Sequence, residues 1–183
     1  MENLKDIILV DENDQPIGTG EKLDVHRKAL MHRAFSVIVF DSEGKMLLQR
    51  RALSKYHSPG LWTNACCSHP RPGEDTLSAA LRRLNEELGF QCHLHYHGRF
   101  HYIAPFDNGL TENEIDHVFS GIYNGEVPFN SNEVAEIMWV DGLTLRSWMK
   151  DKPEEFTVWF RIIYDRIAQF YPLKINLDFN VVG

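Results

Sequence analysis

The sixteen residues Glu74–Gly89 read EDTLSAALRRLNEELG, and they give the strongest indication of the fold in this chain. Leucines recur at helical spacing, at positions 77, 81, 84 and 88, and Gly89 is the kind of residue that ends a helix. The pattern predicts a helix from about Asp75 to Leu88, with the leucines forming its apolar stripe.

Charged side chains lie near both ends of this stretch. Arg82 and Glu86 are one turn apart, as are Arg83 and Glu87, so an exposed helix face with two ion pairs is one interpretation. The adjacent carboxylates of Glu86 and Glu87, with Glu74 at the far end, are also suitable oxygen ligands for Mg²⁺, which takes substrate phosphate oxygens as well. The helix alone leaves both interpretations open.

The rest of the chain alternates strand-like runs and helices. Asp41-Ser42-Glu43-Gly44 separates two apolar runs and predicts a hairpin. The predicted strands are Ile7–Val10, Ala34–Phe40, Met46–Arg51, Gly98–Ile103, His117–Tyr123 and Glu136–Val140. The further helices are Leu143–Lys150 and a longer one from about Pro153 that buries Phe156, Trp159, Phe160, Ile163 and Ile167. Strands interrupted by one central helix and followed by helices predict an α/β protein, an α+β sandwich.

Composition excludes several classes of protein. The 183 residues carry 19 Lys and Arg against 26 Asp and Glu, a formal net charge of −7, which argues against a general nucleic-acid binder. The 11 Phe, 4 Trp and 6 Tyr argue against disorder, and no apolar run approaches the roughly 18 residues of a membrane span.

The N-terminus is too polar for a signal peptide, and three cysteines make no disulfide framework, so we expect a cytoplasmic protein. Nine histidines in an acidic chain suggest bound metal, with scattered surface residues as the alternative.

The spacing of the charged residues in Glu74–Gly89 favours the phosphate- and metal-binding interpretation of this helix over the exposed face with two ion pairs. Seven residues separate Glu74 from Arg82, and Glu86-Glu87-x-Gly89 follows. This resembles the Nudix box, the loop–helix–loop of enzymes that act on diphosphates. The hydrolase pattern is not complete, because Ser68 stands where that pattern has its first glycine and Arg83 replaces a glutamate. Losing a carboxylate and gaining a cation favours binding of a diphosphate over its hydrolysis.

Further motifs extend the resemblance over most of the chain, from about Glu21 to Trp159. They include Arg51-Ala52-Leu53-Ser54-Lys55, Pro59-Gly60-Leu61-Trp62-Thr63-Asn64, Cys67-Ser68-His69-Pro70 and Glu112-Asn113-Glu114. Together they resemble the type I isopentenyl-diphosphate isomerase family of the Nudix superfamily, which interconverts isopentenyl and dimethylallyl diphosphate at the start of isoprenoid biosynthesis. The resemblance implies a Nudix-like fold, with a mixed sheet flanked by helices. It also implies an N-terminal extension (1–33) that contributes metal ligands, a catalytic domain (34–170) and a C-terminal tail (171–183).

The resemblance implies a role for each matching residue. The family's ligands for one divalent transition metal, Mn²⁺ or Zn²⁺, match His26, His32, His69, Glu112 and Glu114. The catalytic residues match Cys67, Glu114, Tyr102 and Trp159. The groups that bind the substrate diphosphate match Lys22, Arg51, Lys55, Ser68 and Arg83, with Mg²⁺ held partly by Glu87 and with Glu86 and Glu74 as secondary candidates.

Elementary chemistry supports these catalytic and metal-binding roles. It also allows a purely structural interpretation of several of the residues. Glu112 and Glu114 alternate with period two, so on a strand both would face one side. An allylic proton shift needs one group that gives a proton and one that takes a proton, and Cys67 and Glu114 suit that need. Cys66 is the competing thiol, any single histidine is more often a surface or core residue, and Trp159 fits a helix core equally well.

Three functions are therefore compared. The first is the isomerase, acting as a monomer on an isoprenoid diphosphate, with no nucleic-acid or membrane partner. The second is a Nudix hydrolase of a nucleoside or other diphosphate, and the third is a silent module that binds metal or diphosphate without turnover. Of the remaining histidines, we expect His93, His95 and His97 to form an exposed strand face.

Overall fold

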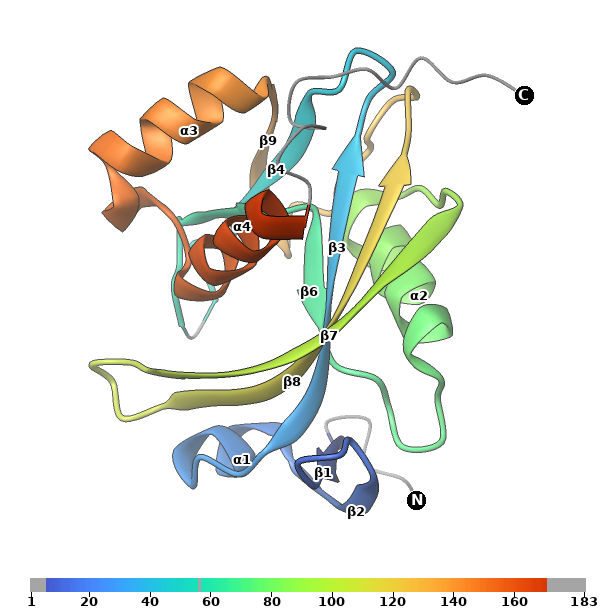
Figure 1. Ribbon diagram of the computed structural model, residues 1–183, viewed down its shortest axis with the longest axis vertical. Coiled ribbons are helices and arrows are strands. Elements are labelled where there is room, and N and C mark those ends of the chain that lie inside the picture. The colour runs from blue at the N-terminus through green and yellow to red at the C-terminus, as the bar shows by residue number, and fades with distance from the viewer. Residues whose placement is uncertain (1–5, 56, 171–183) are drawn as a thin grey trace.

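Nine strands form one mixed sheet in the computed structural model, which describes residues 6–55 and 57–170 (Figure 1). The predicted C-terminal tail and the first five residues of the predicted N-terminal extension lie outside the described residues. The strands are β1 (Asp6–Val10), β2 (Pro16–Glu21), β3 (His32–Phe40), β4 (Met46–Arg51), β5 (Trp62–Asn64), β6 (Cys66–Ser68), β7 (Leu94–Pro105), β8 (Thr111–Ile122) and β9 (Val134–Val140). The helices are α1 (Lys22–Arg27), α2 (Thr76–Leu88), α3 (Gly142–Asp151) and α4 (Val158–Phe170), with a 3-10 turn at Pro153–Glu155.

The strand β3 organises the sheet. It runs parallel to β8 along its whole length and antiparallel to β6, while β7 continues the sheet beyond β8. The hairpin partner β4 pairs with β3 at Phe40 and Met46, next to the turn, and then pairs along its length with β5 and β9. The sheet therefore has two halves that meet at this hairpin.

Alternate residues of β3 divide the core into two layers. Phe35, Val37 and Val39 pack with the buried face of α2, whereas Ile38 packs with α3 and α4 on the other face. In Figure 1 the helix α2 lies on one side of the sheet, and α3 and α4 lie on the other. The predicted α+β sandwich, with a mixed sheet flanked by helices, is confirmed.

The central helix closely follows its sequence signals. Asp75 is the N-cap residue, and its carboxylate accepts a hydrogen bond from the Ser78 amide at 3.0 Å. At the other end Gly89 adopts φ 73°, where a Cβ atom would lie 2.8 Å from the Pro128 carbonyl oxygen. The predicted apolar stripe is wrong at its first position. Leu77 is 41% exposed because the buried face of the first turns is formed by two alanines, Ala79 and Ala80.

The predicted start of the last helix is also wrong. Pro153–Glu155 forms only a 3-10 turn, and Phe156 is extended and bridges to Trp62 of β5. The Thr157 amide donates to the Trp62 carbonyl oxygen, so α4 begins at Val158. Pairing with β5 has overridden the local preference of Pro-Glu-Glu to begin a helix.

The chain segment before β3 is attached to the sheet through a buried carboxylate. Asp14, in the turn between β1 and β2, accepts from Arg33 at 2.7 Å and from Arg99 and His117 at 2.9 Å each. We call these four residues the Asp14 cluster. It links the β1–β2 turn to β3, β7 and β8. None of the helices in the described part of the chain is both long and apolar enough to span a bilayer.

Candidate active site

Strand pairing brings distant polar residues to one place beside the sheet. His32, the first residue of β3, lies opposite Glu114 in the parallel pair with β8. Tyr102 lies opposite the same glutamate across β7 and β8, and its hydroxyl donates to Glu114 Oε2 at 2.5 Å. His69 follows β6, an antiparallel neighbour of β3, and its Nε2 lies 2.9 Å from Glu114 Oε1. The topology therefore surrounds the Glu114 carboxylate of β8 with one group from β3, one from β7 and one from the residue that follows β6.

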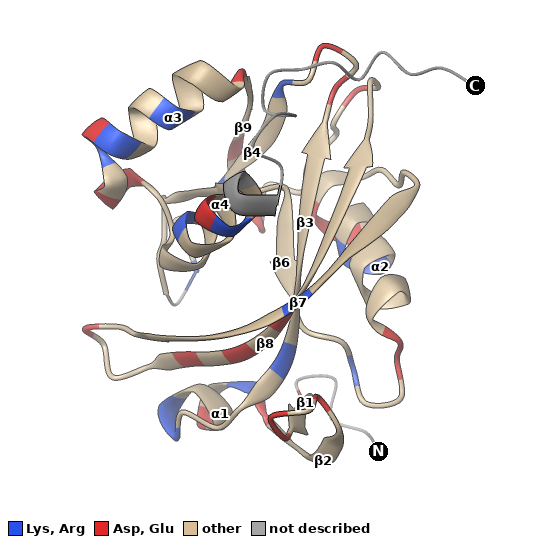
Figure 2. Cartoon of the chain, in the orientation of Figure 1, with Lys and Arg blue, Asp and Glu red and all other residues tan. Residues whose placement is uncertain are grey.

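Five side chains can hold a metal ion in this region. Figure 2 shows acidic residues on the part of β8 that lies beside α1, the helix that contributes His26. Each member of the group offers one ligand atom, and these atoms all lie within 4.8 Å of one another. The group consists of the five residues that the sequence predicts together, His26, His32, His69, Glu112 and Glu114. We call it the His/Glu cluster.

The hydrogen bonds of the His/Glu cluster fit a bound cation. Nδ1 of His26 lies 2.5 Å from the Lys22 carbonyl oxygen, and Nδ1 of His32 lies 2.8 Å from that of Leu30. A ring nitrogen facing a carbonyl oxygen carries the proton, so each ring presents the lone pair of Nε2 to the cluster. Both Nε2 atoms and Glu112 Oε2 are buried and have no hydrogen-bond partner among the described residues. A cation bound between these lone pairs would satisfy all three.

The distances between the ligand atoms of the His/Glu cluster also fit a bound cation. Nε2 of His26 lies 2.9 Å from Glu112 Oε2, and Nε2 of His32 lies 3.3 Å from Glu114 Oε1. Adjacent ligands bound at about 2.1 Å in an octahedral site are separated by about 3.0 Å. The distances thus resemble the edges of a coordination polyhedron.

The cluster and its neighbours shift one another's protonation. Burial opposes ionisation of Glu114, but the adjacent His32 side chain and the hydrogen bond from Tyr102 outweigh burial and lower its pKa to about 2. Burial, aided by the charges of Lys22 and His32, holds the pKa of His69 well below its usual value. An ionised carboxylate and a neutral imidazole are the forms that bind metal ions.

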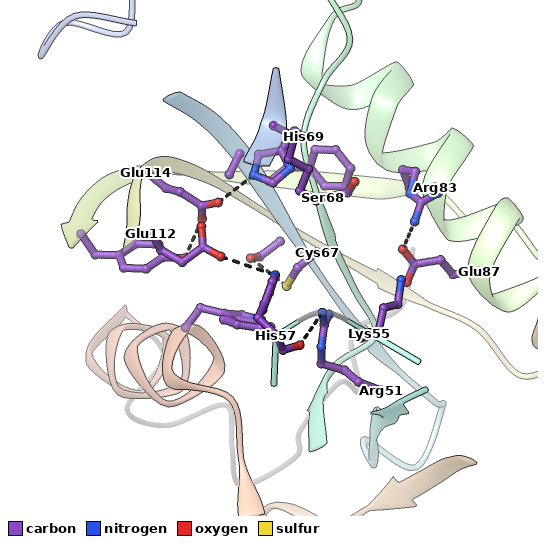
Figure 3. A pocket seen from close by; sticks show the side chains of 16 residues that line it. Arg51, Lys55, His57, Cys67, Ser68, His69, Arg83, Glu87, Glu112 and Glu114 are labelled. Carbon is purple, nitrogen blue, oxygen red and sulfur yellow. Dashed lines mark hydrogen bonds and ion pairs between the residues drawn. The ribbon is translucent and has the colours of Figure 1, made fainter. Parts of the chain in front are cut away.

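The two adjacent cysteines face opposite sides of β6. Cys66 is fully buried in the core layer against α2, whereas Cys67 lines a pocket on the other side (Figure 3). The Cys67 thiol donates to Asn64 Oδ1 at 3.0 Å, and burial raises its pKa above the usual range, with the nearby Asp116 charge acting in the same direction. Of the two thiols, only Cys67 is placed to meet a ligand in this pocket.

A buried carboxyl group lies behind Cys67. Ser36 Oγ is 3.3 Å from Cys67 Sγ and donates to Asp116 Oδ2 at 2.9 Å. Asp116 is 1% exposed, its Oδ1 has no hydrogen-bond partner within the described ranges, and burial raises its pKa well above the usual value. Sequence reasoning missed Asp116, although it continues the period-two series of Glu112 and Glu114 along β8.

Cationic side chains form the opposite end of the pocket. Figure 3 shows Cys67 between the carboxylates of β8 on one side and Arg51, Lys55 and Arg83 on the other. Lys22, Ser68 and Glu87 also line this pocket, as the sequence predicts.

The carboxylates at this end are held by neighbouring side chains. Glu87 accepts hydrogen bonds from Arg83 and from Gln49, the latter at 2.9 Å. Glu133, which sequence reasoning missed, accepts from both Lys55 and Arg83. No pattern in the sequence distinguishes this glutamate from other charged loop residues.

The far end of the Nudix-like helix lies apart from the pocket. Glu74 accepts from Arg82 at 2.7 and 2.8 Å and from the Arg71 amide at 2.9 Å. Neither Glu74 nor Glu86 is among the residues that line the pocket. Both predicted ion pairs of α2, Arg82–Glu86 and Arg83–Glu87, are present.

Aromatic rings form one wall of the pocket. The Arg51 guanidinium carbon lies 5.2 Å from the Trp159 ring centroid, and the His57 ring meets that indole edge-on at 5.5 Å. Burial and the Arg51 charge lower the pKa of His57 to about 3, so its imidazole is neutral. The sequence offers no signal for His57, because a lone histidine in a loop has no periodic partner.

The arrangement brings together nearly all of the predicted site residues. Twelve of the fourteen line the pocket, and His26 and His32 are fully buried in the adjoining cluster. His93, His95 and His97 are exposed as predicted and lie elsewhere. The pocket can therefore present the His/Glu cluster, a thiol, an aromatic wall and a cationic end to one ligand.

Comparisons with known proteins identify the family of the chain. Residues 30–160 match the NUDIX domain family. The chain is 49% identical over 162 residues to "Isopentenyl-diphosphate Delta-isomerase 2" of Photorhabdus laumondii, covering 88% of this chain and 92% of that protein. It is 51% identical over 160 residues to "Isopentenyl-diphosphate Delta-isomerase" of Burkholderia multivorans, covering 87% and 91%.

Solved structures support the fold. DR0079 from Deinococcus radiodurans has a TM-score of 0.66 at 20% identity, over 80% of this chain and 89% of that one. A MutT protein from Methanosarcina mazei has a TM-score of 0.62 at 20% identity, over 76% and 94%. Fold and sequence together show that the chain belongs to the NUDIX domain family and, within it, to the isopentenyl-diphosphate Delta-isomerases.

Proposed function

We propose that this chain interconverts isopentenyl and dimethylallyl diphosphate, with Cys67 and Glu114 as its proton-transfer pair. The observation that carries the proposal is the position of these two groups on one pocket, whose other end is lined by Arg51, Lys55 and Arg83. Relatives that are about half identical over most of their length bear the name of this activity.

The proposed reaction moves a double bond by adding one proton and removing another. Protonation of the terminal alkene carbon gives a tertiary carbocation, and loss of a proton from the carbon on the other side gives the allylic product. Cys67 and Glu114 supply the donor and the acceptor of these steps. Tyr102 holds one oxygen of Glu114 through its 2.5 Å hydrogen bond. The indole of Trp159 faces the cation, an interaction worth about 2 kcal/mol when desolvated.

The cationic end of the pocket is the proposed diphosphate site. Arg51, Lys55 and Arg83, with Lys22 and Ser68, would bind the phosphate oxygens, and Glu87 would hold a Mg²⁺ that accompanies them. Because the whole chain carries a formal charge of −7, an anionic substrate requires such a local group of cations.

The His/Glu cluster is the proposed site of one transition metal, Mn²⁺ or Zn²⁺. A cation bound there supplies positive charge beside Glu114 and so stabilises its ionised form. His32 and His69 contact Glu114 Oε1 at 3.3 and 2.9 Å and keep that carboxylate at a fixed position relative to the pocket, while His26 pairs with Glu112.

The competing functions have less support. Arg83 occupies the place of a hydrolase glutamate and is paired with Glu86 and Glu87, which removes a ligand from a multi-metal hydrolytic centre. A silent binding module would have no use for a thiol and a carboxylate on one pocket.

Residues 1–33 are proposed as an extension that supplies metal ligands to the catalytic domain 34–170, followed by a tail at 171–183. The protein is proposed to act as a cytoplasmic monomer without nucleic-acid or membrane partners.

The test is incubation of the metal-loaded protein with isopentenyl diphosphate in deuterated water. We expect dimethylallyl diphosphate that carries deuterium in a methyl group, with no release of phosphate. Cys67→Ala is the matched inactive variant, since it removes the thiol of one pocket residue. Phosphate release without an allylic product would instead support the hydrolase, and binding without either product would support the silent module.

A further inference from the structure

A chain of buried hydrogen bonds begins at the aromatic wall. The indole nitrogen of Trp159 donates to Thr63 Oγ1 at 3.0 Å, and the Thr157 hydroxyl donates to the same oxygen at 3.0 Å. Thr63 in turn donates its own hydrogen to Asn64 Oδ1, also at 3.0 Å. Because an indole N–H only donates, the direction of this chain is set at its first bond.

Asn64 continues the chain to the thiol. Its side-chain nitrogen donates to the carbonyl oxygens of Val37 and Cys66, at 3.0 Å each, which uses both amide hydrogens. Oδ1 is therefore fixed as an acceptor, and it accepts from Thr63 and from the Cys67 thiol at 3.0 Å. No other orientation of this amide satisfies all four bonds.

The intermediate residues of this chain are sealed from solvent. Asn64 is 0% exposed and Thr63 is 1% exposed, and both belong to the three-residue strand β5. The two ends come from unrelated elements, since Cys67 lies on β6 and Trp159 on α4. Buried networks in which every donor has its acceptor favour one arrangement of their members.

We infer that Thr63 and Asn64 are positioning residues that hold the Cys67 thiol and the Trp159 indole in one fixed arrangement beside the pocket. The inference rests on the proposed function, in which the thiol transfers a proton and the indole faces the cation. Neither Thr63 nor Asn64 is among the residues that line the pocket, so both act through the groups they hold. A misplacement of about 1 Å at a reacting group can cost a factor of about 100 in rate, so holding these groups has a measurable effect.

The variants Thr63→Val and Thr63→Ser test the inference. Valine keeps the shape of threonine but offers neither an acceptor to Trp159 nor a donor to Asn64, whereas serine keeps the hydroxyl. We expect Thr63→Val to lower kcat about tenfold, equivalent to about 1.4 kcal/mol, with KM unchanged. Thr63→Ser should stay within about twofold of the wild type. Thermal unfolding, measured alongside, shows whether each variant is folded at the assay temperature.

A double-mutant cycle with Trp159→Phe separates positioning from general packing. Phenylalanine keeps an aromatic face but cannot donate to Thr63. If the hydroxyl acts by holding the indole, the kcat losses of Thr63→Val and Trp159→Phe will be strongly non-additive, because each breaks the same hydrogen bond. Additive losses, or a Thr63→Ser variant as slow as Thr63→Val, would overturn the inference.

The remaining outcomes are also decisive. A folded Thr63→Val variant with wild-type kcat overturns the positioning role while leaving the isomerase proposal intact. A wild-type protein that makes no dimethylallyl diphosphate contradicts the proposed function itself. Should Thr63→Val not fold, Thr63→Ala takes its place against Thr63→Ser: an unchanged kcat in Thr63→Ala refutes the inference, and a loss of kcat that Thr63→Ser does not show supports it.

Discussion

Removal of metal from the His/Glu cluster should destabilise the whole protein. Three of its buried atoms, Nε2 of His26, Nε2 of His32 and Oε2 of Glu112, have no hydrogen-bond partner among the described residues. Each buried unsatisfied polar atom costs about 1–3 kcal/mol. Nε2 of His26 and Oε2 of Glu112 lie 2.9 Å apart and compensate one another in part when no metal is bound, so a bound cation should recover about 3 kcal/mol in total and not the upper limit of the sum. In a chain of this size that gain raises Tm by about 6–12 °C.

The assay compares thermal unfolding after chelation with unfolding in excess Mn²⁺ or Zn²⁺. We expect the wild type to gain the full shift and His26→Ala to lose most of it, because one ligand is missing. His95→Ala is the control, since His95 is exposed and lies outside the cluster. An equal Tm with and without metal, or a full shift in His26→Ala, would refute the reasoning from unsatisfied atoms.

Further expectations concern the two thiols, the Asp14 cluster and acid stability. Cys67→Ala should abolish the conversion of isopentenyl diphosphate while Cys66→Ala keeps substantial turnover, and equal losses would mean that the assignment of the thiol is wrong. Asp14→Ala leaves partly buried cationic partners without their carboxylate and should lower the free energy of unfolding in urea by about 3 kcal/mol, whereas an unchanged midpoint would show the cluster to be dispensable. In the metal-free protein Glu114, with its pKa lowered from 4.5 to about 2, contributes stability that is complete above pH 4.5 and is lost as the pH falls toward 2. Wild-type Tm should therefore fall more steeply than that of Glu114→Gln between pH 5 and 2, and parallel curves would contradict this.

The parts of the fold that sequence predicts are those with strong local signals. The helix α2 has an N-cap at Asp75, a leucine stripe and a terminal Gly89, and its bounds match the prediction within one residue. The strands β5 and β6 have three residues each and no alternation long enough to detect. The start of α4 depends on the contact of Phe156 with Trp62, which no local pattern encodes.

The site residues also fall into two groups, those with a local sequence signal and those without one. Motifs such as Cys67-Ser68-His69-Pro70 carry enough information to identify residues one by one, and the structure brings those residues together. His57, Glu133 and Asp116 reach the site through a loop position, a pair of ion contacts and a strand register, respectively. The placements of His57 and Glu133 are properties of the tertiary structure and leave no sign in a single sequence, whereas Asp116 could have been found from its period-two spacing with Glu112 and Glu114 on β8.

The position of His26 in the sequence has a practical consequence for the design of protein fragments. The NUDIX match begins at residue 30, yet α1, with Lys22 and His26, precedes that boundary. A fragment cut at the boundary of the match would keep β3 through β9 but would lack His26 of the His/Glu cluster and Lys22 of the pocket. The unit defined by the family match is therefore shorter than the unit that contains all of the site residues, and expression fragments should begin before α1.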